Sequence, residues 1–344
     1  MSHEITILSS GEAHHLSNGQ AEAAFVGSTW HGLGVDVSEA MNSEEAMHLA
    51  HLTWLVNQYP VYKKMPDGEM VEVPGWKTNT RSDNNFDLGL VKNNYQVVQN
   101  HVAFQVMDSL YMDGILKYES AFSLNGGKDV VLLARLPKVD EVVDGDVSHR
   151  YLMMVLNHAG LKCIIFLPTS VRVVCANTKR LALNQGEGQI LKVRHTGDMN
   201  LKLEDARQAL LEINEAFSKE TIQAREMASK LVSKDESVEY LDHLYPMPKL
   251  TDENFTQRRF DKVKTIREDV MHNYLYAPEQ QISGIKESRW SLFNAVTQYE
   301  DHRNFKGKDI PSKAETRFKA ITLGQTHELK RKAWNYWNDA VSVN

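Results

Sequence analysis

The chain has 344 residues, of which 42% are hydrophobic and 24% are charged, a composition typical of a folded globular protein long enough for two domains. Only two cysteines occur, Cys163 and Cys175, and no apolar run approaches the roughly 20 residues of a membrane-spanning helix. Disordered, disulfide-stapled and membrane-embedded classes are therefore excluded, and because the N-terminal sequence lacks a secretory pattern we expect a protein of a reducing cytoplasm.

The formal net charge of -6 is unevenly distributed along the chain. Residues 1–149 contain 9 Lys and Arg against 20 Asp and Glu, whereas residues 150–199 contain 7 against 2. Residues 200–344 contain 23 of each kind. The basic central stretch has two interpretations: a local anion-binding face, or a set of cations that pair with the acidic N-terminal half.

The N-terminal region predicts little regular structure. Residues 1–20 are small and polar without periodicity, and we expect them to form a poorly ordered arm. Ser43 is followed by Glu44 and Glu45, a combination that favours the start of a helix, because a hydroxyl accepts from a free amide and carboxylates stabilise the positive end. We expect a helix over residues 43–50 with Ser43 as its cap.

The middle of the chain predicts an antiparallel sheet. Turn residues at 66–68, 125–127 and 158–160 supply the positive φ that tight hairpins need, so the strands they join are antiparallel. A helix over 101–110 has its apolar residues at i, i+3, i+4 and i+7. The fold class is therefore α+β, with this helix packed on the sheet. The strand-like runs, rich in β-branched and aromatic residues, are 54–62, 70–73, 88–91, 95–98, 118–123, 130–136, 151–157, 162–167 and 170–175.

Beyond residue 197 the pattern becomes helical. Apolar residues recur in steps of three and four from 203 to 231, which predicts a helix of about nine turns with a narrow apolar stripe. The stripe needs a partner, either the amphipathic segment 255–274 as an antiparallel helix pair or a second copy of the chain. Further helices are expected over 287–302 and 312–340. We therefore divide the chain into a flexible arm (1–20), an α+β domain (21–197) and a helical domain (198–344).

Common catalytic and metal-binding signatures are missing from the sequence. Gly126-Gly127-Lys128 is followed by Asp129 rather than by Ser or Thr, so it is a turn and not a phosphate-binding loop. The acidic loop containing Asp140, Glu141, Asp144 and Asp146 lacks the alternation of a calcium site. We expect no catalytic residues, no metal and no cofactor.

Soft metal ligands or a reactive thiol are the remaining alternative for catalysis. His158, Cys163, Cys175 and His195 have suitable side chains, but their spacing matches no close zinc motif, and both cysteines lie in apolar runs where cysteine is a small hydrophobic residue. Arg172 is close enough in sequence to Cys175 to lower a thiol pKa, yet no histidine is placed beside it as a base.

Nucleic-acid binding is the chemistry with positive support from the sequence. Proteins that bind single strands combine a basic track for phosphates with aromatic side chains on which bases stack. The aromatic candidates are also plausible core residues, because large rings are usually buried. The candidate contact residues are Lys162, Arg172, Lys179, Arg180, Lys192, Arg194, Tyr95 and Tyr118.

Four ordered motifs carry a resemblance to a known family: residues 25–34 with Trp30-His31-Gly32-Leu33-Gly34, and the runs 88–100, 171–178 and 290–302. Together they resemble the phage/plasmid-like family of domain of unknown function 932, which implies a mobile-element origin and a bacterial host cytoplasm. The order of strands and helices is also similar to the Rad-type single-strand annealing proteins of phages, whose rings hold single-stranded DNA in a basic groove. That similarity is an analogy of fold and implies a homo-oligomer.

Three hypotheses follow from the sequence. The first is a non-enzymatic protein that binds single-stranded DNA in recombination or strand annealing. The second is an interaction module that binds a host protein, indicated by the acidic first 149 residues and the long helix. The third is a metal- or thiol-dependent enzyme that uses His158, Cys163 and Cys175.

Overall fold

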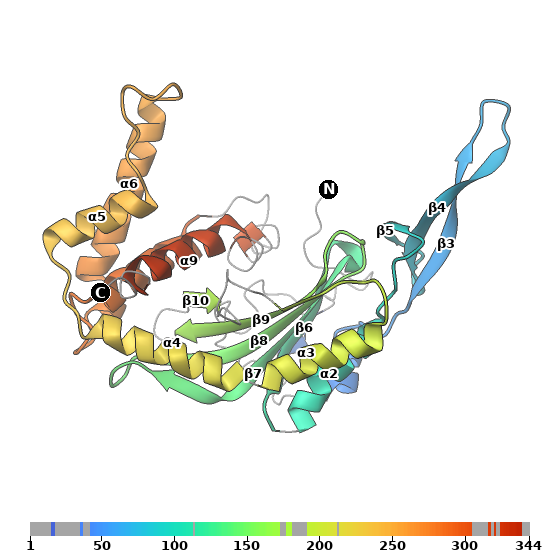
Figure 1. Ribbon diagram of the computed structural model, residues 1–344, viewed down its shortest axis with the longest axis horizontal. Coiled ribbons are helices and arrows are strands. Elements are labelled where there is room, and N and C mark those ends of the chain that lie inside the picture. Colours follow the sequence, from blue (N-terminus) through green and yellow to red (C-terminus); the bar gives the residue numbers. More distant parts are fainter. Residues whose placement is uncertain are drawn as a thin grey trace.

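The computed structural model describes residues 15–17, 35–36, 42–112, 114–172, 177–180, 191–211, 213–304, 316–317, 320 and 324–338. Its centre is a strongly curved sheet with helices across one face (Figure 1). Two projections extend beyond the opposite face, a β-hairpin at one end and a pair of helices at the other (Figure 1). The mixed α+β class predicted from the sequence is confirmed.

The central sheet has the strand order β10-β9-β8-β7-β6-β1-β2, and β11 also pairs with β9. Except for the parallel pair β1–β2, the neighbouring strands are antiparallel, as the predicted turns require. Gly126, with φ of 73°, turns the chain between β6 and β7. The strands are β1 (His15–Ser17), β2 (Val35–Asp36), β6 (Lys117–Leu124), β7 (Asp129–Glu141), β8 (Val147–Asn157), β9 (Ile164–Arg172), β10 (Asn177–Arg180) and β11 (Leu191–Val193).

A second sheet forms the projecting arm, with the order β3 (Val56–Lys64), β4 (Met70–Arg81) and β5 (Asp87–Lys92). Its base is fixed to the turns of the central sheet: the Asn79 side-chain amide donates to the His158 carbonyl over 2.8 Å, and Arg81 donates to the Gly126 carbonyl over 3.1 Å. Gly89 is required here, because a Cβ at this position would lie 2.7 Å from the Ala159 carbonyl oxygen.

The described helices pack in two hydrophobic cores. The first lies between the central sheet and the helices α1 (Ser43–Leu49), α2 (Asn100–Met112), α3 (Met199–Leu211) and the first half of α4 (Ile213–Ala228). The second joins the end of α4 to the remaining helices, so α4 belongs to both cores. These helices are α5 (Lys234–Leu244), α6 (Gln257–Tyr276), α7 (Arg289–His302) and α9 (Gln325–Asn338).

The predicted partner of the long apolar stripe is wrong. Leu203, Leu210 and Phe217 pack in the core of the central sheet, which removes their apolar surface from water. Only the end of the stripe, from Ala224, shares a core with the segment expected to be its helical partner. The stripe runs over two helices, α3 and α4, on either side of residue 212.

Two local predictions are also corrected. Asn42, rather than Ser43, caps α1: its side chain accepts from the Glu45 amide over 3.0 Å, and the Glu45 carboxylate accepts from the Asn42 amide. The predicted strand over 95–98 is a loop, held by a hydrogen bond from the Gln96 amide to the His195 carbonyl. The helices expected over 101–110 and 287–302 are confirmed as α2 and α7. Among the described residues, no helix combines the length and apolar character needed to cross a membrane.

Candidate nucleic-acid interface

One edge of the central sheet collects residues of the basic central stretch. Both β10 and β11 pair with the same side of β9, Arg180 opposite Thr169 and Lys192 opposite Ile165. Thr169 and Ile165 share one face of β9, four residues apart, which is about 13 Å along a strand. We call this set of Arg172, Lys179, Arg180, Lys192 and Arg194 the basic edge.

Two cations of this stretch pair with carboxylates of the acidic N-terminal half. Arg150 is buried and forms an ion pair with Asp140, and Lys162 lies 3.2 Å from the Asp129 carboxylate. For these two, the charge-pairing interpretation holds. Lys192 and Arg194 are exposed, whereas for Arg172, Lys179 and Arg180 the structure describes the backbone but not the side chains.

The two aromatic candidates, Tyr95 and Tyr118, are buried, so they are core residues rather than exposed platforms for bases. Tyr118 is 1% exposed and donates to the Asp108 carboxylate over 2.8 Å. Tyr95 donates to the Asn157 carbonyl over 3.0 Å and stacks on His195 with ring centroids 4.7 Å apart. Burial raises the pKa of Tyr95 above its ordinary value. Neither ring is presented to a base in this structure.

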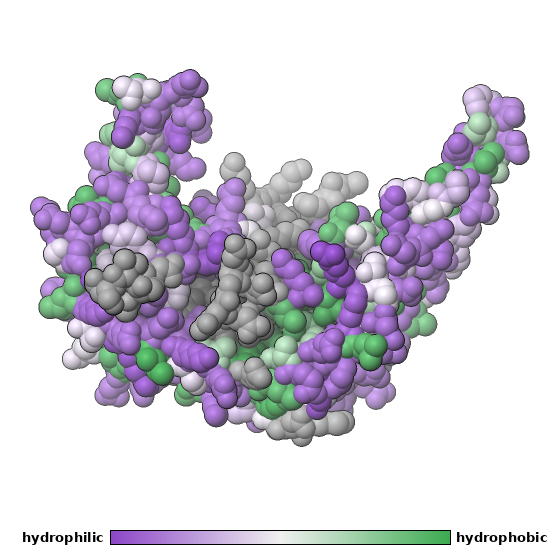
Figure 2. All heavy atoms as spheres, in the orientation of Figure 1, coloured by the Kyte–Doolittle hydropathy of each residue, from purple (hydrophilic) through white to green (hydrophobic). Residues whose placement is uncertain are grey.

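An exposed aromatic surface that sequence reasoning missed lies on the projecting arm. Thr78 pairs with Tyr59 on one side and with Leu90 on the other, which puts Tyr59, Leu90 and Trp76 on one face of the three strands. Their exposed fractions are 48%, 58% and 37%. The ammonium of Lys92 lies 4.4 Å from the centroid of the Trp76 ring. We call these four residues the arm face, and Figure 2 shows hydrophobic residues on the arm among hydrophilic ones.

The sequence did contain a signal for the arm face. Alternation of apolar and polar residues indicates a half-buried strand, but a hairpin that projects from the body exposes both of its faces. The expected strand 54–62 includes Tyr59, but its pattern does not tell which face packs on the body, and the expected strand 70–73 ends before Trp76, whereas β4 continues to Arg81.

The base of the arm contains a buried polar cluster with two histidines. The His158 Nε2–H donates to the Asn100 side-chain oxygen over 2.8 Å, and Trp54 lies edge-on to the His158 ring with centroids 5.3 Å apart. Burial lowers the pKa of His158 to about 3, helped by the nearby charges of His195 and Arg81, and burial lowers the pKa of His195 to about 4. Among the described residues, the buried nitrogens Trp54 Nε1, His158 Nδ1 and His195 Nε2 find no hydrogen-bond partner.

This cluster bears on the metal-site alternative. His158 and His195 are neighbours, whereas Cys163 is a free, partly exposed cysteine and Cys175 lies outside the described residues. In the acidic loop, Asp140 pairs with Arg150, and Asp146 accepts from the Trp290 indole over 2.6 Å. In the part of the chain that is described, no three His, Cys, Asp or Glu side chains are grouped to hold a metal ion.

A buried charged cluster joins α7 to α9 in the second core. The Lys330 ammonium lies 2.5 Å from the Asp301 carboxylate, and their side chains are 3% and 0% exposed. The neighbouring carboxylate of Glu300 accepts from Tyr245 over 3.0 Å and from Thr326 over 3.2 Å. The ammonium and both carboxylates have polar partners, so we assign the cluster a role in stability. β10 contacts both helices, which brings the basic edge to this end of the fold.

Comparison with known proteins gives a family but no characterised relative. The family model named Domain of unknown function (DUF932) matches residues 87–334, which include both the basic edge and the cluster of α7 and α9. No curated protein and no solved structure matches this chain. Because the family model covers more than half of its length, the chain belongs to the DUF932 family.

Proposed function

We propose that this protein binds single-stranded DNA without covalent chemistry, with phosphates on the basic edge and bases on the arm face. The observation that supports this most directly is the pairing of β10 and β11 along β9, which gathers cations separated by up to 22 positions in sequence onto one sheet edge. Positive residues along one edge suit a phosphate backbone, and exposed rings suit unpaired bases.

The two surfaces are connected through the turn between β8 and β9. A Cβ at Gly160 would lie 3.6 Å from the Leu90 carbonyl oxygen, so the arm face begins beside this turn. Leu161 in the same turn is 82% exposed, and Lys162 follows it. We place the path of the strand from Lys192 over this turn to the aromatic residues of the arm.

Charge reversal at the basic edge tests the phosphate contacts. The variant Lys192→Glu/Arg194→Glu should weaken binding of a labelled single-stranded oligonucleotide, measured by fluorescence anisotropy, by about tenfold or more, because two exposed cations are replaced by anions. The slope of log affinity against log salt should also fall by about 2. The variant Arg172→Glu/Lys179→Glu tests two further residues of the basic edge in the same way.

The matched control is Lys262→Glu/Lys264→Glu on α6, since both of these lysines are exposed and lie away from the sheet. An equal loss of affinity in this control would mean that only total charge matters, and it would reject the basic edge as the site. No binding of wild-type protein at low salt would reject the proposal and favour the host-protein hypothesis.

Removal of an arm-face ring tests the base contacts. Trp76→Ala should lower the affinity for the single strand by about 1–3 kcal/mol, the range measured for one base stacked on an aromatic side chain. Binding to a duplex of the same sequence should change much less, because its bases are already stacked. Tyr276→Ala is the control, since Tyr276 is 67% exposed on α6. Equal effects of the two substitutions would remove the arm face from the proposal.

We also propose a biological setting and an oligomeric state for the protein. A phage or plasmid origin, a role in strand annealing, a cytoplasmic location and a homo-oligomeric state follow from the resemblances described for the sequence. Sedimentation of the protein with and without oligonucleotide tests the oligomeric state directly.

A further inference from the structure

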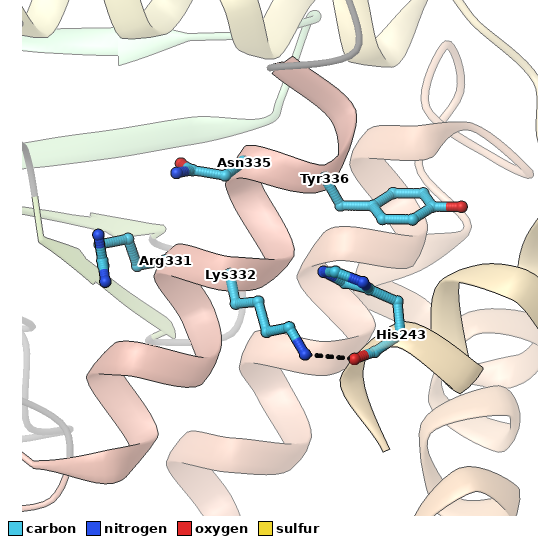
Figure 3. Close-up of a pocket in the computed structure, with 5 residues that line it drawn as sticks. All are labelled: His243, Arg331, Lys332, Asn335 and Tyr336. Carbon is cyan, nitrogen blue, oxygen red and sulfur yellow. Dashed lines mark hydrogen bonds between the residues drawn. The ribbon is translucent and has the colours of Figure 1, made fainter. Parts of the chain in front are cut away.

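An open depression of about 350 Å³ lies between α5 and α9 (Figure 3). It is lined by His243 from α5 and by Arg331, Lys332, Asn335 and Tyr336 from α9. Its volume falls in the range of sites that hold small ligands. No acidic residue lines it, and its lining carries the two cations of α9, of which Arg331 pairs with the neighbouring Glu328 carboxylate.

The side chains that line the depression extend to both sides of α9. Arg331 uses Nε and Nη2 for the Glu328 carboxylate, at 3.1 and 2.8 Å, and its side chain remains 43% exposed. Lys332 donates to the His243 carbonyl, which uses one of its three protons. Figure 3 shows Arg331 and Asn335 pointing to one side of α9, and Tyr336 pointing to the other, above His243.

The depression also offers ring surface. The rings of His243 and Tyr336 lie with centroids 5.1 Å apart at an angle of 46°. Burial and the charge of Lys332 lower the pKa of His243, which keeps its imidazole neutral at physiological pH. Neutral rings beside two cations are complementary to a ligand with a flat apolar part and an anionic part.

We infer that this depression binds a nucleoside phosphate, with the phosphate on Arg331 and Lys332 and the base against Tyr336 and His243. The inference deepens the proposed function and rests on it for its biological context: because α9 contacts β10, a strand held on the basic edge could present its terminal nucleotide here. A free nucleotide has the same chemistry and is the other possible source of the ligand.

Isothermal titration with adenosine monophosphate and with adenosine tests the assignment. The monophosphate should bind at least about tenfold more tightly than adenosine, and Arg331→Gln/Lys332→Gln should abolish that difference, because both cations of the site are lost. Lys262→Gln/Lys264→Gln on α6 is the matched control and should keep it. Equal binding of the two compounds by wild-type protein, or equal behaviour of the two variants, would overturn the inference.

A short 5′-phosphorylated oligonucleotide distinguishes the two sources. If it binds more tightly than both the monophosphate and its unphosphorylated form, the site holds a strand end, and if the monophosphate binds more tightly, the site holds a free nucleotide. Failure of the monophosphate to bind, with oligonucleotide binding still sensitive to Lys192→Glu/Arg194→Glu, rejects this site and leaves the proposed function. Monophosphate binding without any oligonucleotide binding does the reverse.

Discussion

Replacing Asp301 by alanine is expected to lower the free energy of unfolding by about 3–5 kcal/mol, as found when one partner of a buried ion pair is removed. The substitution leaves the Lys330 ammonium in the second core without the carboxylate 2.5 Å away. Burial already lowers the pKa of Lys330, while Asp301 and Glu300 oppose that shift. Urea denaturation at neutral pH measures the loss.

Two comparison variants separate the charge effect from a general defect of α7. Glu268→Gln breaks the exposed pair of Lys264 and Glu268 on α6, and it should cost less than about 1 kcal/mol because water already solvates both charges. The double variant Asp301→Leu/Lys330→Met should recover most of the lost stability, since it removes both buried charges together. If Asp301→Ala costs no more than Glu268→Gln, the cluster does not stabilise the second core.

The strands and helices were largely predictable because local patterns determine them. Turn residues at 125–127 and 158–160 fixed the antiparallel pairing of β6 with β7 and of β8 with β9. The partner of the long apolar stripe was not predictable in the same way. Its three- and four-residue spacing describes a helix with one apolar face but does not distinguish a sheet from another helix as the surface that covers it.

The candidate site was only partly predictable for a related reason. Basic residues along 162–194 were recognised from composition, but which of them are neutralised depends on long-range pairs such as Lys162 with Asp129. Tyr95 and Tyr118 have the same local pattern as exposed strand aromatics, and only the packing of the loop and of α2 shows that they are buried. The exposed rings of the arm required knowledge that the hairpin projects from the body.

The buried histidines at the base of the arm should make the protein lose stability in mild acid. Their pKa values in the folded protein, about 3 for His158 and about 4 for His195, lie below the ordinary value of 6.5. The unfolded chain therefore binds more protons below pH 6.5, so stability is complete above that pH and falls as the pH is lowered toward the folded values. At pH 5 each histidine accounts for a loss of about 2 kcal/mol relative to pH 7.

Urea denaturation at pH 7 and pH 5 tests this expectation through a difference between variants. Carboxylates also lower the free energy of unfolding in acid. The test therefore compares the fall in this free energy between pH 7 and pH 5 in the wild-type protein with the fall in His158→Gln/His195→Gln. Removing both imidazoles should reduce the pH-dependent loss by up to about 4 kcal/mol, while His272→Gln, which changes an exposed histidine on α6, should leave it unchanged. If the double variant keeps the wild-type pH dependence, then water enters the cluster and the two imidazoles become protonated in the folded protein. If the His272 variant keeps the acid-dependent loss and the double variant does not, acid sensitivity is tied to the contact between arm and sheet. The His158 carbonyl accepts from the Asn79 side-chain amide, so His158 belongs to the joint that fixes the arm.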